Sequence, residues 1–211
     1  MEFDLATVDV RSRYKLLTAL VVPRPIALVT SCGPEGVVNA APYSFFNVFS
    51  QDPPLLVLGI QRKAPGTPKD TGRNIDLTGE FVVNLVDEAI AEAMNVCAVD
   101  FPAEVSELDA AGLHLEPSRR VTPGRIREAP AALECRSFTL LRIGLERELV
   151  IGEILAVHVR EGLLDPETLR IDYGRYRPIG RLCGNLYCRT GDIFALRRRT
   201  FEEWSREARS E

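Results

Sequence analysis

The residues between Val37 and Leu58 carry the side chains best suited to holding a ligand. Short polar groups are interspersed there with aromatic rings and small residues, namely Asn39, Ala40, Ala41, Tyr43, Ser44, Phe45, Phe46, Asn47, Phe49 and Ser50. The mixture suits a planar ligand with polar edges, because the rings supply flat apolar contact and the alanines let a ligand approach the backbone. A hydrophobic strand followed by a polar loop would have the same composition, since short apolar runs are ambiguous. Both interpretations stay open for this segment.

A second candidate site is the run Lys69-Asp70-Thr71, with Asn74 shortly after it. The run stands where a short helix is expected to begin after a strand over 55–60. A helix N-terminus offers free backbone N–H groups and a partial positive charge, which attract phosphate. Thr71 could add a hydroxyl and Lys69 a full charge. The alternative is that Asp70 or Thr71 only caps the helix, but the neighbouring segment 37–58 favours the phosphate interpretation.

The familiar catalytic constellations are absent from the sequence. The only histidines are His114 and His158, and no cysteine pair has ligand spacing, so no metal site is expected. There is no GxSxG elbow, no Gly-Lys-Ser/Thr phosphate loop and no GxGxxG fingerprint. The five cysteines are irregularly spaced and indicate reduced thiols, with a reactive thiol at Cys183 or Cys188 as the less favoured alternative. These absences point to chemistry carried by a bound cofactor.

Composition restricts the class of protein further. A chain of 211 residues with 45% hydrophobic and 27% charged residues is typical of one folded domain over 1–211. The net charge of −4 gives no electrostatic basis for binding nucleic acid, and Arg197-Arg198-Arg199 borders a charged tail that we expect to be solvated. No apolar run could cross a membrane, and the N-terminus lacks the apolar region of a signal peptide. We therefore expect a cytoplasmic protein.

The elements that must position these residues are mostly strands. Alternation and turn residues predict strands over 25–31, 37–40, 55–60, 81–86, 133–143 and 149–160, and a last hairpin of 186–189 with 193–196. Helices are expected over 69–77, over 87–98 with Asp87 as N-cap, and over 200–209 in a charged C-terminal helical region, 197–211. Closely spaced strands joined by hairpins favour an antiparallel barrel with peripheral helices over a parallel α/β sheet.

An ordered set of segments between about 20 and 190 carries a family resemblance. The segments are Pro23-Arg24-Pro25 with IALVTS, Gly36 to Phe46, Ser50 with Asp52-Pro53-Pro54 and LLVLGI, Lys69-Asp70-Thr71-x-x-Asn74, FVVN, Val150 to Glu153, His158, and Pro178 to Tyr187. In this order they resemble the flavin reductase-like family, the FMN-binding split barrels that include flavoredoxin. The closing segment PIGRLCGNLY is nearer to the flavoredoxin-like branch.

The resemblance implies a fold and a set of site residues. The fold would be mainly β with peripheral helices, a six-stranded antiparallel Greek-key split barrel that forms a homodimer and binds FMN. The loop Asn39 to Phe46 would lie along the flavin, with Ser50 close by, and the 5′-phosphate would be held by Lys69, Asp70, Thr71 and Asn74. Arg181 and Tyr187 would line the pocket or the dimer wall. His158 would lie near the flavin or the nicotinamide as a catalytic residue, although a histidine satisfied within the barrel explains it equally well.

The expected activity is hydride transfer from NADH or NADPH to bound FMN, and from there to flavin or another acceptor. A flavin cofactor would carry this chemistry without a nucleophile or an acid–base pair, which explains the missing constellations. The alternative is a non-enzymatic FMN-binding electron-transfer protein with a protein partner as electron donor or acceptor. A third interpretation is a split barrel with another ligand or a purely structural dimer. NADH cannot be distinguished from NADPH, because no dinucleotide fingerprint is present.

Overall fold

Most of the regular structure in the computed structural model, which describes residues 1–63, 66–102 and 105–208, is β-strand. The strands are β1 (Ala27–Cys32), β2 (Val38–Tyr43), β3 (Phe46–Gln51), β4 (Pro54–Gln61), β5 (Glu80–Leu85), β6 (Leu115–Glu116), β7 (Arg125–Ile126), β8 (Ala131–Ile143), β9 (Arg147–Val159), β10 (Ile179–Arg181) and β11 (Tyr187–Arg189). The helices are α1 (Val10–Leu20), α2 (Asp70–Thr78), the 3-10 turn η1 (Glu88–Ile90), α3 (Ala91–Val96), α4 (Glu107–Ala111) and α5 (Phe201–Ala208).

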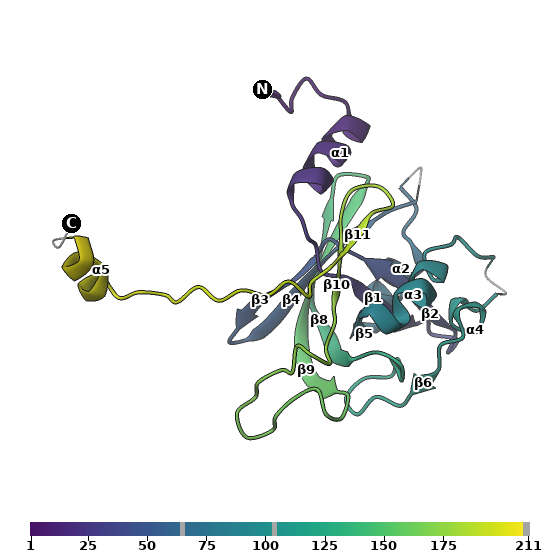
Figure 1. Ribbon diagram of the computed structural model, residues 1–211. Coiled ribbons are helices and arrows are strands. Elements are labelled where there is room, and N and C mark those ends of the chain that lie inside the picture. Colours follow the sequence, from purple (N-terminus) through teal and green to yellow (C-terminus); the bar gives the residue numbers. More distant parts are fainter. Residues whose placement is uncertain (64–65, 103–104, 209–211) are drawn as a thin grey trace.

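One antiparallel sheet dominates the described ranges, with the seven strands in the order β2-β1-β5-β8-β9-β4-β3. The edge strands β2 and β3 lie at opposite ends of this order, yet only Ser44 and Phe45 separate them in the chain. The sheet must therefore curl until its two edges meet at this corner, which is how a sheet closes into a barrel. Helices α2 and α3 lie at the side of the sheet, whereas α1 and α5 project from the body (Figure 1).

The large sheet has seven strands where six were expected. The additional strand is β3, which pairs with β4 from Phe46↔Leu58 to Gln51↔Pro54. The expected loop Asn39 to Phe46 is instead most of β2 followed by a two-residue turn. The expected last hairpin is also wrong, because β11 pairs with β10 and residues 193–196 form no strand. The sequence pattern missed β3 because most of its side chains are exposed, so they show no alternation of buried and exposed positions.

The predicted helices are confirmed with small shifts in their limits. Helix α2 starts one residue after Lys69, and the Asp87 side chain caps η1 by accepting from the Ala89 N–H. The C-terminal helix α5 begins at Phe201, four residues inside the expected region, and residues 209–211 lie outside the described part of the chain. Helices α1 and α4 were not expected. No helix within the described ranges is long and apolar enough to span a membrane.

Two apolar cores hold the barrel and its helices in place. The barrel interior is filled by residues such as Phe81, Leu58 and Val150, and Ile75 of α2 closes one end of it. A second core joins the outer face of β1 to α3 and α4 through Leu28, Met94 and Leu108 among others. Every residue of β1 is buried, because the strand has one core on each face. Helix α2 is thereby fixed with its N-terminus next to β2.

Candidate functional site

A groove runs along β2 and joins most of the residues expected to bind a ligand. Among the described residues, its largest hollow measures about 690 Å³ and is lined by Asn39, Ala41, Lys69, Asp70 and Thr71 together with Pro42, Gln61, Arg62, Lys63, Glu107 and residues 97–101. Two smaller hollows of about 210 and 170 Å³ continue it and share Tyr43, Ser44 and Tyr14. Pro42 lines all three hollows. We call the whole the β2 groove.

The N-terminus of α2 forms one end of the β2 groove. Lys69 is the N-cap residue and makes no side-chain capping bond, so the first backbone N–H groups of the helix have no capping partner there. Thr71 is buried, and its hydroxyl lies 2.8 Å from the side-chain amide of Asn39. With the Asn39 amide oxygen toward Thr71, its nitrogen donates to Glu107 Oε1 at 3.3 Å. This end of the groove therefore has the free helix N–H groups on which the predicted phosphate site depends.

Two cationic side chains that were not predicted add positive charge to this end of the groove. Arg62 and Lys63 follow the end of β4 and line the same hollow as Lys69. Lys63 Nζ lies 3.2 Å from Asp70 Oδ2, and Arg62 Nε lies 3.4 Å from Oε1 of the buried Glu148. Their position directly after a buried strand, beside the predicted phosphate segment, was the available sequence signal.

Tyr43 supplies a buried hydroxyl to the middle of the β2 groove. The phenol is buried, and its oxygen has no hydrogen-bond partner in the described part of the chain. Burial raises the pKa of Tyr43 to about 12, with further raising by the carboxylates of Asp70, Glu107 and Glu148 and an opposing effect of the Thr71 hydroxyl. The phenol is therefore protonated at neutral pH and can donate to a ligand.

Phe45 and Phe46 are adjacent in the chain but serve different surfaces, since Phe45 ends the turn after β2 and Phe46 begins β3. Phe46 is buried in the barrel core. Phe45 lines the β2 groove, stacks on Tyr14 of α1 at 6.2 Å between ring centroids, and has the Arg147 guanidinium 5.0 Å from its ring centre. Tyr14 and Arg147 are thus further wall residues that the sequence alone did not indicate.

The far end of the β2 groove contains the residues of the closing motif. Arg181 lies over the Tyr187 ring at 4.4 Å from the centroid, and both side chains line this hollow. The Tyr187 hydroxyl donates to Asn95 Oδ1 at 3.4 Å. Ser44 Oγ accepts a 3.4 Å bond from Nε of the buried Arg24. Ser44 and the Arg181–Tyr187 pair are therefore brought together as expected from the resemblance.

Three of the expected binding residues lie elsewhere. Ala40 is buried in the second core, on the face of β2 that turns away from Ala41. Ser50 lies at the far end of β3, where its hydroxyl accepts from the Asp52 N–H at 3.2 Å. Asn74 is buried against β1 and donates to Ser31 Oγ at 3.2 Å. None of the three lines the hollows of the β2 groove.

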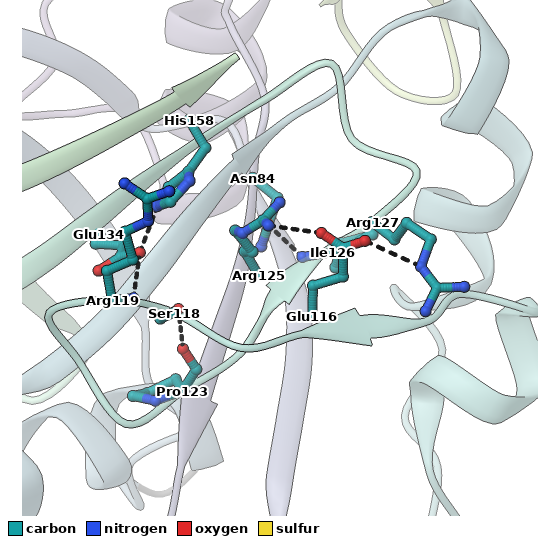
Figure 2. Close-up of polar contacts among 10 residues, drawn as sticks. All are labelled: Asn84, Glu116, Ser118, Arg119, Pro123, Arg125, Ile126, Arg127, Glu134 and His158. Carbon is teal, nitrogen blue, oxygen red and sulfur yellow. Dashed lines mark hydrogen bonds and ion pairs between the residues drawn. The ribbon is translucent and has the colours of Figure 1, made fainter. Parts of the chain in front are cut away.

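His158 also lies outside the β2 groove, in a polar network at the other end of β8 and β9. Its Nε2 is 2.5 Å from Oε1 of Glu134, which is fully buried. The Glu134 carboxylate also accepts from the backbone N–H groups of Arg119 and Arg120, at 2.8 and 2.6 Å. Figure 2 shows Glu134 between His158 and Arg119. The arrangement holds the loop before β7 and gives His158 a hydrogen-bond partner outside the β2 groove, which favours the satisfied barrel histidine.

This network predicts a specific acid sensitivity. Burial of Glu134 alone would raise its pKa, but the two backbone N–H groups and His158 outweigh that effect and hold the pKa below its ordinary value of 4.5. A pKa lowered by folding stabilises the protein above the ordinary value, and that stabilisation is lost as the pH falls below 4.5. We expect Glu134→Gln to lower the free energy of unfolding at neutral pH, and its deficit against wild type to shrink below pH 4.5. Urea unfolding over a pH series measures this, and a deficit that does not change with pH would contradict it.

Comparison with known proteins agrees with the curled antiparallel sheet. Residues 19–180 match the family described as flavin reductase like domain. The structure of 2-nitrobenzoate 2-nitroreductase from Pseudomonas fluorescens is 43% identical, with a TM-score of 0.87 over 95% of this chain and 98% of that one. Nitrilotriacetate monooxygenase component B from Bacillus cereus is 37% identical, with a TM-score of 0.88 over 93% of this chain and 98% of that one. Flavoredoxin of Desulfovibrio vulgaris shares the fold at 20% identity, with a TM-score of 0.74 over 93% and 97% of the two chains.

The fold is that of the flavin reductase split barrels, a large antiparallel sheet with a few peripheral helices. The chain belongs to the flavin reductase-like family.

Proposed function

We propose that this protein is an NAD(P)H-dependent flavin reductase that binds FMN in the β2 groove, with the phosphate at the N-terminus of α2. The observation that carries the proposal is the continuity of the groove, which joins an uncapped helix N-terminus beside Arg62 and Lys69 to the aromatic wall at Tyr43 and Phe45. FMN has the same order of parts, a dianionic phosphate linked to a planar ring system with polar edges. Family membership supports a flavin ligand, and the names of the relatives support oxidoreductase activity.

The chemistry of the lining residues suits FMN. A phosphate carries close to two negative charges at neutral pH, and Lys69 makes no ion pair with any described side chain, so its charge is available. The buried Tyr43 hydroxyl lacks a partner, and an unsatisfied buried donor is costly unless a ligand completes it. Thr71 and Asn39 add neutral polar groups beside the helix N-terminus.

When bound, FMN supplies hydride acceptance from a reduced nicotinamide and electron delivery to an acceptor. The protein contributes position and charge. Lys69 and Arg62 would neutralise the phosphate, and the protonated Tyr43 would donate to the cofactor. Phe45, held between Tyr14 and Arg147, keeps one side of the groove apolar. Two solved relatives above 30% identity bear names with different substrates, 2-nitrobenzoate and nitrilotriacetate, so the proposal ends at the reduced flavin.

The test is the absorbance of the purified protein loaded with FMN, before and after NADH or NADPH is added without oxygen. Loss of the flavin band near 450 nm without any partner protein is the expected result. A protein that binds FMN but keeps its colour would be an electron carrier reduced by another protein. A protein with no affinity for FMN would overturn the cofactor assignment itself.

A substitution of His158 separates its two possible roles. We expect His158→Ala to leave the rate of flavin reduction unchanged, because the imidazole bonds to Glu134 and does not line the β2 groove. Removing a partner from a buried carboxylate should cost about 1.5–3 kcal/mol, equivalent to a fall in Tm of roughly 3–12 °C at this chain length. Stopped-flow kinetics and thermal unfolding measure the two effects. A large loss of rate with an unchanged Tm would instead make His158 a catalytic residue.

A further inference from the structure

Thr190, directly after β11, still donates its hydroxyl to the Pro178 carbonyl at 2.7 Å, and beyond it the described chain leaves the body of the protein. Residues 190–200 form no helix or strand, and α5 lies at the end of this extended segment, away from the sheet (Figure 1). We call residues 190–208 the C-terminal arm. An extended segment of eleven residues can reach roughly 36 Å, more than the width of a small domain. The arm is therefore long enough to lie across a neighbouring molecule.

The C-terminal arm has the side chains of an interface and not those of a solvated tail. Its large apolar residues are each 55–85% exposed and are Ile193, Phe194, Leu196, Phe201 and Trp204. Phe201 and Trp204 are three residues apart, so they lie on one face of α5. Their ring centroids are 6.0 Å apart. Exposed apolar surface of this extent on an extended segment marks a contact with another molecule.

Helix α1 offers a complementary surface. Its exposed apolar residues recur at helical spacing, at Val10, Tyr14, Leu17, Leu20 and Val21. Tyr14 touches Phe45, and Thr18 bonds within its own helix, but the outer stripe of α1 is uncovered. The helix is basic, with Arg11, Arg13 and Lys15 and no acidic residue, whereas α5 has Glu202 and Glu203 in its first turn. Two helices with apolar stripes and flanking residues of opposite charge are suited to pack together.

Within one chain these two surfaces do not meet, because α1 and α5 project in different directions (Figure 1). A second copy of the chain carries the same two surfaces, so its α1 stripe can receive the arm of the first copy and its arm can cover the α1 stripe of the first. Two copies related by a two-fold axis could exchange arms, so that each arm covers the α1 stripe of the other copy. We propose that the C-terminal arm is an exchanged arm that packs its apolar residues, with α5 against α1, on a second copy of this chain. The inference is independent of the proposed flavin chemistry.

Trp204 provides a direct test, since it is the only tryptophan in the sequence. In the full-length protein we expect a mass of twice 23.5 kDa by light scattering and a Trp204 emission maximum at shorter wavelength than in the unfolded chain. Leu20→Asp, on the α1 stripe, should shift the emission to that of the unfolded chain. The matched control is Leu145→Asp, an equally exposed leucine in the β8–β9 turn, which should leave the emission unchanged.

A mixed dimer distinguishes exchange from packing within one chain. Leu20→Asp is co-expressed with a second chain carrying Trp204→Phe and an intact α1. If arms are exchanged, the Trp204 arm of the first chain meets the intact α1 of the second, and the emission returns to shorter wavelength. Failure of this rescue, a monomer with buried Trp204, or a dimer with Trp204 emitting as in the unfolded chain would each overturn the proposal.

Discussion

Lys69→Ala is expected to lower the affinity for FMN by roughly 10- to 100-fold, because a charge-assisted contact to phosphate is worth about 1.5–3 kcal/mol. Affinity for riboflavin, which lacks the phosphate, should not change. Lys69 lies at the uncapped N-terminus of α2 and makes no ion pair with the described residues, so its removal breaks no internal contact that could confuse the result. Fluorescence titration of both flavins measures the two affinities side by side.

The matched control is Arg73→Ala, one turn further along the same helix. Arg73 is exposed and pairs with Asp70 at 3.2 Å, but it does not line the β2 groove. Arg73→Ala removes the same charge from the same helix as Lys69→Ala. It should change FMN affinity by less than about threefold, which corresponds to the free energy of an exposed ion pair. Equal losses for the two variants would show only a general charge effect. If Lys69→Ala also lowered the affinity for riboflavin, Lys69 would not act through the phosphate, and the assignment of the phosphate to the N-terminus of α2 would be wrong.

The sequence predicted the buried strands well, because burial leaves a continuous apolar run between turn residues. Residues 81–86 were expected as a strand and form β5, displaced by one residue. The strand β3 was missed because only Phe46 of its side chains reaches the core, while Val48 and Phe49 are exposed. It is held by main-chain pairing with β4, which leaves no periodic pattern in the side chains. Helix α1 was missed for a related reason, since its apolar stripe faces no core of its own chain.

Local chemistry found the parts of the site that lie close together in sequence. Lys69 and Thr71 were recognisable from the helix start, and Tyr43 from its polar and aromatic neighbours. Glu107 and Arg147 reach the groove from distant segments, so no local pattern could place them there. His158 depends on strand register, which shifts at a bulge between Glu134 and Cys135 on the neighbouring strand. Such a shift changes which residues face each other, and spacing along one strand does not reveal it.

Gly72 shows how a distant residue decides a local choice, and its replacement should have a large effect. Glycine is a poor residue within a helix, and alanine would ordinarily stabilise it by up to about 1 kcal/mol. Here a Cβ atom would overlap Oε2 of Glu148, with Ile60 Cγ2 3.8 Å away on the same side. Glu148 is buried and pairs with Arg62, so moving its carboxylate aside would disturb a buried ion pair. We expect Gly72→Ala to destabilise the protein by up to about 2 kcal/mol net, since overpacking costs about 1–3 kcal/mol and the helix gain offsets up to about 1 kcal/mol of it.

The same substitution should also weaken FMN binding, because displacing Glu148 releases the Arg62 guanidinium from its position in the β2 groove. Thermal unfolding should show a fall in Tm of up to roughly 4–8 °C. The control is Gly191→Ala, where a Cβ atom meets nothing within 4 Å, and little change is expected. Glu148→Ala removes the carboxylate atom that a Cβ at position 72 would overlap. Gly72→Ala should therefore destabilise the Glu148→Ala variant much less than it destabilises the wild type. The double-mutant cycle should give a coupling free energy between the two substitutions above about 0.5 kcal/mol. Additive effects of the two substitutions would mean that Glu148 is not what requires glycine at this position, and the link between the buried pair and the phosphate end of the groove would be lost.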